Sequence, residues 1–134
     1  MKDKTEVITA KEFIALNKKN NKNKYGNNKV EVDGKVFDSK LEAEYYKQLK
    51  LRVKANDIVT FKTQPRYPLQ NAFKKDGRCF QSIDYIADFE IHHNDGSVEV
   101  VDVKGKKTDV FRIKEKIFNF IYSYKLTLVT KDDL

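Results

Sequence analysis

The chain has 134 residues, 40% of them hydrophobic and 35% charged, and its 27 basic and 20 acidic residues give a net charge of +7. This length suits one domain with a single core, and no apolar run is long enough to form a membrane-spanning helix. No hydrophobic signal segment follows Met1, so we expect a cytoplasmic protein. The lone Cys79 excludes an internal disulfide and a cysteine-built zinc site, and we expect its side chain to be buried.

The positive charge is concentrated near the N-terminus. Residues 1–29 have a net charge of +5, whereas residues 30–134 have a net charge of only +2. A capping-box pattern at residues 9–12 predicts a short helix. Residues 17–29 are rich in Lys and Asn and lack the side chains to form a core, so they predict a flexible basic arm. Such an arm suits a polyanion, but it could also be only a solubilising leader.

The folded domain is predicted to span residues 30–134 and to begin with a β-hairpin, because alternating residues flank Asp33-Gly34. Residues 39–54 then predict a helix, and residues 58–63 and 67–69 predict strands, the second at an edge or a bend because prolines interrupt it. The apolar side chains of the helix recur about every four residues. They are Leu41, Tyr45, Tyr46, Leu49 and Val53.

The clearest β pattern runs from residue 82 to residue 91 and returns, after a turn, as a second strand over residues 98–104. A helix over residues 108–124 and a last strand over residues 126–129 complete the chain. The order helix, three strands, helix, strand predicts an α/β domain with a mixed sheet. The expected apolar stripe of the second helix is Val110, Ile113, Ile117, Ile121 and Tyr124.

The length of the turn at residues 94–96 decides whether two carboxylates meet. A two-residue turn would pair Asp88 with Val103 and send Asp88 and Asp102 to opposite faces of the sheet. A three-residue loop, with Gly96 in the third position as a type I turn plus bulge requires, pairs Asp88 with Asp102. We predict the three-residue loop, which places the two Cβ atoms roughly 5 Å apart.

These carboxylates and the nearby Lys104 are the groups that could perform chemistry. Asp102 and Lys104 share a face because side chains alternate along a strand. Unpaired charge on an otherwise apolar strand is costly to bury, so such groups usually serve each other, a metal or a substrate. Two hard anionic ligands this close suit Mg²⁺, and Lys104 can hold a scissile phosphate or an attacking water.

Glu42 is a fourth candidate, and two interpretations of it stay open. It lies on the edge of the buried stripe of the first helix, so it can face the sheet, whereas Glu44 belongs to the solvated face. However, Ser39 and Glu42 also have the spacing of a capping box, in which Glu42 would bond to the start of its own helix.

The ordered set of Glu42, Asp88, Asp102 and Lys104 resembles the PD-(D/E)XK nuclease superfamily. More narrowly, the chain resembles a family of small phage-encoded endonuclease-like proteins over about residues 24–120. The matching motifs are KYGNNK (24–29), FDSKLEAEYY (37–46), YIADF (85–89) and VDVKG (101–105), continued by Thr108, Phe111, Lys114, Lys116 and Phe118.

This resemblance implies a restriction-endonuclease-like core, a mixed β-sheet flanked by helices, and Mg²⁺-dependent hydrolysis of DNA phosphodiester bonds, with Mn²⁺ able to substitute. By the match, Asp88, Asp102 and the backbone carbonyl of Val103 would bind the metal, and Lys104 would position or activate the attacking water. Glu42 would complete the metal site or orient that water. The proline of the motif name is replaced here by alanine, which the superfamily tolerates.

We therefore expect a DNA endonuclease that selects branched, nicked or junction DNA, as Holliday junction resolvases do, in the cytoplasm of a phage-infected or lysogenic bacterium. By analogy it would form a homodimer, and it could need a phage or host protein partner. The alternative is a catalytically silent nucleic-acid-binding or partner-binding module with the same fold. The expected DNA contacts are Lys24, Tyr25, Lys29, Lys106, Lys107, Lys114 and Lys116, although a solvated helix face explains several of these lysines equally well.

Overall fold

The structure is a computed structural model that describes residues 29–134, and the chain divides into two units, Met1–Lys40 and Leu41–Leu134. In the first unit, β1 (Val30–Val32) and β2 (Lys35–Phe37) form an antiparallel hairpin. Its turn residues have positive φ angles of 55° and 78°, the conformation of a two-residue type I′ turn. This confirms the first predicted hairpin. The predicted N-terminal helix and basic arm lie outside the described residues.

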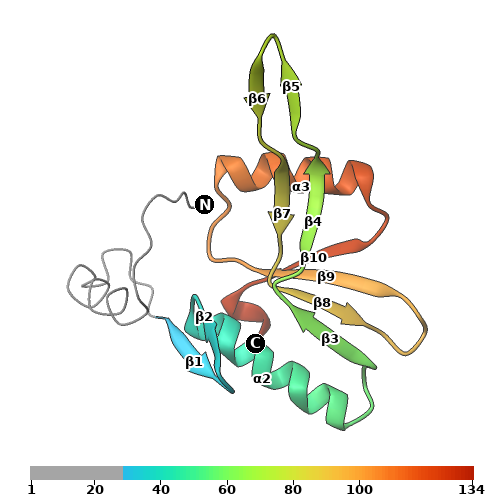
Figure 1. Ribbon diagram of the computed structural model, residues 1–134. Helices are drawn as coiled ribbons and strands as arrows, with labels where there is room; N and C mark the ends of the chain where they lie inside the picture. The colour runs from blue at the N-terminus through green and yellow to red at the C-terminus, as the bar shows by residue number, and fades with distance from the viewer. Residues whose placement is uncertain (1–28) are drawn as a thin grey trace, which may run out of the picture. The chain divides into compact units, whose positions relative to one another are not determined.

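A four-stranded sheet forms the centre of the second unit, with strand order β10-β9-β8-β3 (Figure 1). The first three strands in chain order are antiparallel neighbours, and the last runs parallel to β9. The strands are β3 (Thr60–Thr63), β8 (Phe89–His92), β9 (Val98–Val103) and β10 (Lys125–Val129). The prediction of a mixed α/β domain is confirmed.

Helix α2 (Lys40–Lys54) lies against this sheet through its aromatic side chains. The rings of Tyr45 and Phe89 have centroids 5.3 Å apart, and those of Tyr46 and Phe61 are 5.7 Å apart. Because Phe89 belongs to β8 and Phe61 to β3, the helix spans two neighbouring strands. This packing fixes the first turn of α2, which carries one of the predicted site residues.

The loop between β8 and β9 has the predicted length. The amide of His93 donates to the carbonyl of Ser97 at 2.9 Å, and Gly96 has a φ of +90°. The three-residue loop is therefore confirmed. The ladder ends at the pair of Phe89 with Val101, one residue before the predicted pair, and the side chains of Asp88 and Asp102 come within hydrogen-bonding reach of each other there.

The strand predicted over residues 82–91 is instead two strands in different sheets. β7 (Ile83–Ile86) pairs with β4 (Arg66–Gln70), and the chain bends at Ala87 and Asp88 before it enters β8. β4 has β7 as its one partner in the sheet, which confirms the predicted edge position. The prediction of one strand was wrong because side-chain alternation continues through the bend while the pairing partner changes.

A second hairpin was not predicted. β5 (Phe73–Lys75) and β6 (Arg78–Phe80) pair around Asp76-Gly77, and both turn residues have positive φ. The Asp-Gly signal is the same as at the first hairpin, but the flanking strands are only three residues long. Cys79 lies here and is exposed, so the expectation of a buried cysteine was wrong.

The single-turn 3-10 helix η1 (Lys131–Asp133) is the last element of the chain.

Helix α3 (Asp109–Ile121) begins after Thr108, whose Oγ1 accepts from the amide of Phe111 at 3.1 Å. Its predicted buried stripe was wrong, because Val110 and Ile113 are 63% and 60% exposed. The side chains that the helix buries are those of Phe111 and Phe118, which pack with the tyrosines of β4 and β7. The larger aromatic surfaces decide which face turns inward, since they bury more apolar area.

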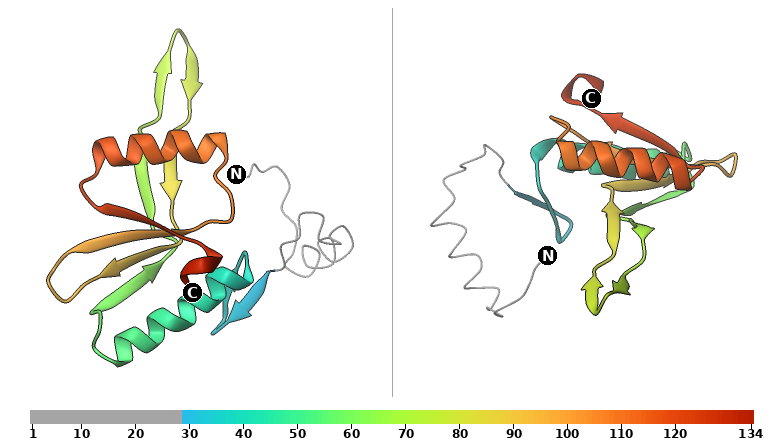
Figure 2. Two further views of the ribbon diagram at one scale, coloured as in Figure 1. Left: turned by 180° about the vertical axis from the view of Figure 1, so that it is seen from behind. Right: turned by 90° about the horizontal axis from the view of Figure 1, so that it is seen from above.

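The two helices therefore cover different parts of the second unit. Seen from behind in Figure 2, α3 crosses one face of the β4–β7 pair, and the β5–β6 hairpin continues beyond it. None of the helices in the described part of the chain is long and apolar enough to cross a membrane.

Phe118 is the centre of the aromatic core, with ring centroids 5.2 Å from Tyr67 and 5.4 Å from Tyr85. We expect Phe118→Ala to lower the free energy of unfolding by about 3–5 kcal/mol, because it removes a fully buried ring and leaves a cavity. Phe120→Ala is the matched control, since that ring is 91% exposed and its loss should change stability by less than about 0.5 kcal/mol. Urea denaturation of both variants measures the difference. Equal losses would contradict this packing.

Candidate active site

Asp88 lies at the bend where the chain passes from β7 to β8. Its Oδ2 accepts a hydrogen bond of 2.7 Å from the amide of Val103. In a regular ladder with this register, that amide would donate to the carbonyl of Ala87. The amide of Ala87 instead donates to Pro65 at 3.1 Å, because the chain has turned toward β4. The Asp88 side chain thus satisfies a backbone donor that the bend would otherwise leave unpaired.

Asp102 faces Asp88 from the middle of the sheet and is only 4% exposed. The β8–β9 ladder ends one residue earlier, at the pair of Phe89 with Val101, and the amide of Asp88 donates to the carbonyl of Val101 at 3.1 Å. Asp88 and Asp102 therefore lie next to each other at the end of the ladder, with a hydrogen bond between their side chains. The hydroxyl of Tyr85 donates to Asp102 Oδ2. The Nζ of Lys104 lies 3.7 Å from Asp102 Oδ1. Each oxygen of this carboxylate therefore has a donor or a cation beside it.

The two carboxylates raise the cost of ionising this site. Burial of Asp88, its hydrogen bond with Asp102 and the negative charges of Asp102 and Glu42 together raise the pKa of Asp88 to about 9. The amide of Val103 acts in the opposite direction, because it stabilises the ionised form. The Asp88 carboxyl therefore keeps its proton to a much higher pH than an ordinary aspartate does.

Tyr85 is a site residue that sequence reasoning missed. Strict alternation along one strand places it on the face opposite Asp88. The bend after β7 allows both side chains to reach Asp102. Burial and the hydrogen bond to Asp102 raise the pKa of Tyr85, so the hydroxyl keeps its proton and remains a donor. No feature of the sequence reveals this contact without knowledge of the bend.

Glu42 is buried in the first turn of α2, 7% exposed, whereas Glu44 is exposed, as predicted. Its charge contributes to the raised pKa of Asp88, which places it near the carboxylate pair. Within residues 29–134, however, no three His, Cys, Asp or Glu side chains are grouped closely enough to hold a metal ion. The centre of the site is therefore the Asp88–Asp102 pair, with Glu42 beside it.

Lys104 follows β9 at the rim of the site. Its amide donates to the carbonyl of Val129 at 2.9 Å, which fixes the backbone to β10. Its Nζ lies 4.2 Å from the ring centroid of Phe111, and its side chain is 28% exposed. The aliphatic stem and the aromatic contact hold this ammonium group beside the Asp102 carboxylate, where it is still accessible to solvent.

The predicted DNA contacts lie in different surroundings. Lys29 forms an ion pair with Asp38 at 2.9 Å, and Lys107 lies 3.5 Å from Glu115. Lys106 and Lys116 are exposed, and Lys114 is half-buried. Lys24 and Tyr25 lie outside the described residues. Of the predicted lysines that the structure describes, all except Lys114 are therefore exposed to solvent.

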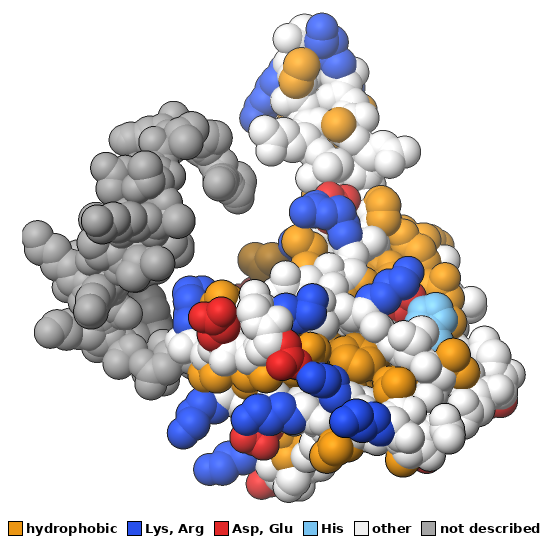
Figure 3. Space-filling view, turned by 60° about the horizontal axis from the view of Figure 1, so that its bottom comes forward, with side chains coloured by type: hydrophobic (Ala, Val, Ile, Leu, Met, Phe, Trp, Pro, Cys, Tyr) orange, Lys and Arg blue, Asp and Glu red, His pale blue; other side chains and the backbone are white. Residues whose placement is uncertain are grey.

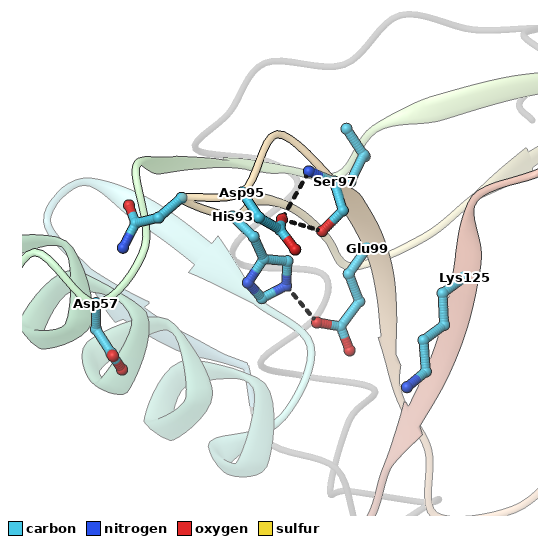
Figure 4. A pocket seen from close by; sticks show the side chains of 8 residues that line it. Asp57, His93, Asp95, Ser97, Glu99 and Lys125 are labelled. Atoms are coloured by element: carbon cyan, nitrogen blue, oxygen red, sulfur yellow. Dashed lines mark hydrogen bonds and ion pairs between the residues drawn. The ribbon is translucent and has the colours of Figure 1, made fainter.

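A pocket at the other end of the β8–β9 hairpin is a separate feature (Figure 4). In it, His93 Nε2 lies 2.8 Å from Glu99 Oε1, and the hydroxyl of Ser97 donates to Asp95 at 2.7 Å. Its charged lining includes Asp57, Asp95, Glu99 and one lysine. A surface with more acidic than basic groups does not suit a phosphate backbone.

A family model described as "Protein of unknown function (DUF1064)" matches residues 22–133. The chain belongs to the DUF1064 family. No curated protein matches it in sequence. The matched region includes the whole candidate site, from Glu42 to Lys104.

Asp88→Asn should stabilise the protein in EDTA. Because the pKa of Asp88 is higher in the folded chain than the roughly 3.9 of an unperturbed aspartate, its contribution to stability is full below that value. It is lost as the pH rises through about 9. An asparagine cannot ionise, so the melting temperature of the variant should exceed that of the wild type by a margin that grows from pH 5 to pH 9.

Asp84→Asn is the control for this prediction, because Asp84 lies four residues earlier, on β7, and pairs with Arg66 at 2.7 Å. Asp84→Asn should change the melting temperature only slightly, and the difference from wild type should not increase from pH 5 to pH 9. A gap between wild type and Asp88→Asn that stays constant from pH 5 to pH 9 would contradict the repulsion between the carboxylates. Melting curves in EDTA at four pH values are sufficient.

Proposed function

We propose that this DUF1064 protein is a Mg²⁺-dependent DNA endonuclease with a PD-(D/E)XK site on a restriction-endonuclease-like core. The observation that carries the proposal is the facing pair of carboxylates, Asp88 and Asp102, with Lys104 next to one of them. The order α2, β3, β8, β9, α3, β10 around the sheet supports the proposed core. The site lies on rigid strands, as a catalytic centre requires.

The residues present fit a magnesium ion. Two carboxylates compete for one proton in a buried position, and a divalent cation would relieve this repulsion. Mg²⁺ prefers oxygen ligands and keeps several waters, so one or two carboxylates with substrate phosphates suffice. Asp88 and Asp102 would hold it, together with the carbonyl of Val103 as predicted from the resemblance. When bound, the ion would neutralise phosphate charge and lower the pKa of a bound water.

The side chains around the carboxylates have distinct roles in this proposal. Val103 and Tyr85 each hold one oxygen of a carboxylate, so the pair is oriented before any substrate arrives. Lys104 presents a positive charge at the rim, where it would hold the scissile phosphate or the attacking water. Glu42 adds negative charge beside the pair and would orient that water.

The proposed substrate class rests on the exposed cations of the domain, which include Lys106, Lys107 and Lys116. Such cations suit phosphate contacts, so recognition would depend on the DNA backbone and DNA shape. This favours branched, nicked or junction DNA, and a homodimer would suit such substrates. The cytoplasm of a phage-infected bacterium is the proposed setting.

Cleavage of linear duplex, single-stranded, nicked and four-way-junction DNA tests the proposal. We expect cutting in Mg²⁺ or Mn²⁺, none in EDTA, and a loss of at least about 100-fold in Lys104→Ala, because a positioned cation at the phosphate is removed. Lys125→Ala is the control, since it removes an exposed lysine from the neighbouring strand. DNA binding without cutting in any metal would overturn the nuclease proposal and favour the silent module.

Tyr85→Phe tests whether a tyrosine positions the metal ligand. We expect a lower cleavage rate and a shift of half-maximal activity to higher Mg²⁺, because Asp102 loses the donor that orients it. Tyr67→Phe is the matched control, since Tyr67 donates to Glu90 at 2.6 Å and also loses a hydroxyl–carboxylate bond. Assays at several Mg²⁺ concentrations should separate the two. The same Mg²⁺ dependence in both variants would reduce Tyr85 to a structural role.

A further inference from the structure

The β5–β6 hairpin projects beyond α3 and presents an exposed surface that the proposed site does not use. It forms the knob at the top of Figure 3, where basic and hydrophobic side chains gather. The strands and turn contain three cations and one acid, a net charge of +2 over residues 73–80. Isolated two-stranded hairpins are marginally stable in water, so this one presents its side chains at a cost in stability.

One face of the hairpin combines aromatic and basic groups. Phe73 pairs with Phe80, and Lys75 pairs with Arg78. Directly opposed residues share a face, and so do residues two apart along a strand, so these four side chains lie together. The Phe rings stack with centroids 4.7 Å apart and an interplanar angle of 11°. The other face carries Lys74 and Cys79.

Arg78 is held in a defined orientation on this face. Its guanidinium lies 4.7 Å from the ring centroid of Phe80. A guanidinium that stacks on an aromatic ring still has its N–H groups directed outward in the plane, where they suit phosphate oxygens. Lys75 stands directly across the turn. Two cations at the tip of a narrow ribbon have the shape and charge that fit a DNA groove and its phosphates.

The base of the hairpin is firmly attached to the rest of the unit. β4 and β7, from which it extends, are covered by α3, and Tyr67 and Tyr85 from these strands belong to the buried core. The hydroxyl of Tyr122 also donates to the carbonyl of Pro68 at 2.7 Å. The hairpin therefore stands on a packed support, so its position relative to the carboxylates is restricted.

We propose that the Lys75–Arg78 face of this hairpin binds the phosphate backbone of duplex DNA within about one helical turn of the carboxylate pair. Ten residues separate Arg78 from Asp88, so the two lie at most about 33 Å apart at ~3.3 Å per residue. One turn of B-DNA is ~34 Å long. The inference rests on the proposed function, because it assumes that the substrate is DNA.

Fluorescence anisotropy of a labelled 30-base-pair duplex in EDTA tests the contact without cleavage. With the full chain, Lys75→Gln should lower the slope of log K against log salt concentration by about 0.9, and adding Arg78→Gln should lower it by about 1.8 in total. Lys74→Gln is the matched control, because it removes the same charge from the opposite face of the same hairpin. Its slope should stay at the wild-type value. Unchanged melting temperatures would show that all variants fold.

The only cysteine in the chain provides a second readout. A benzophenone on a flexible linker attached to Cys79, which is exposed on the other face of the hairpin, should reach past the edge of this narrow ribbon and crosslink to duplex DNA in wild type. The crosslinked nucleotide should lie within roughly 10 base pairs of the position of cleavage. The double variant Lys75→Gln/Arg78→Gln should lose this crosslink.

The outcomes separate this inference from the nuclease proposal. Cleavage by wild type with an unchanged salt slope in the double variant would overturn the hairpin contact and leave the nuclease intact. It would point to a protein partner for the hairpin. A reduced slope and a lost crosslink, without cleavage of any DNA, would support the hairpin contact and overturn the nuclease. An equal slope change in Lys74→Gln would overturn the assignment to one face.

Discussion

The hydrogen bond from the Val103 amide to the Asp88 carboxylate determines the arrangement of the second unit. It occupies the place where a regular ladder would continue to Ala87, so the sheet ends there and the chain is free to join β4. The same hydrogen bond therefore accompanies the bend of the chain and fixes the position of the Asp88 carboxylate. Because the strand turns, Tyr85 reaches Asp102 from one side while Asp88 faces it from the other. Asp88 Oδ2 thus both satisfies a backbone amide and orients the carboxylate of the candidate site.

The candidate site lowers the stability of the folded state, whereas the aromatic core beside it raises that stability. Facing carboxylates in a buried position destabilise the folded state, as the raised pKa of Asp88 shows. Next to them, the rings of Tyr67, Tyr85 and Phe118 bury a large apolar area and hold the strands together. A protein can retain a strained functional centre when adjacent packing offsets its cost. Tyr85 takes part in both, because its ring packs in the aromatic core and its hydroxyl donates to Asp102.

Much of this arrangement could be predicted from local patterns. Side-chain alternation and the position of Gly96 were enough to predict the three-residue loop and the close approach of Asp88 and Asp102. The inward orientation of Glu42 followed from helical spacing. The bend at Ala87 could not be predicted in this way, because alternation is the same whether a strand keeps its partner or changes it. The buried face of α3 was misjudged because Val110 and Ile113 fit a stripe as well as Phe111 and Phe118 do, and only the neighbouring tyrosines decide between them.

The support beneath the β5–β6 hairpin has a consequence for how relatives can diverge. Since the hairpin lies beyond α3, its strands can lengthen or shorten without disturbing the pairing of β4 with β7. Lengthening or shortening each strand by one residue would turn the side chains at the tip to the opposite face of the hairpin. A change of two residues in each strand would leave them on their present face. Hairpin length can therefore vary in steps of about 7 Å, roughly two base pairs of DNA, while the carboxylates stay in place. Inserting or deleting two residues in each strand would therefore change the reach of the hairpin without changing which face its tip side chains occupy.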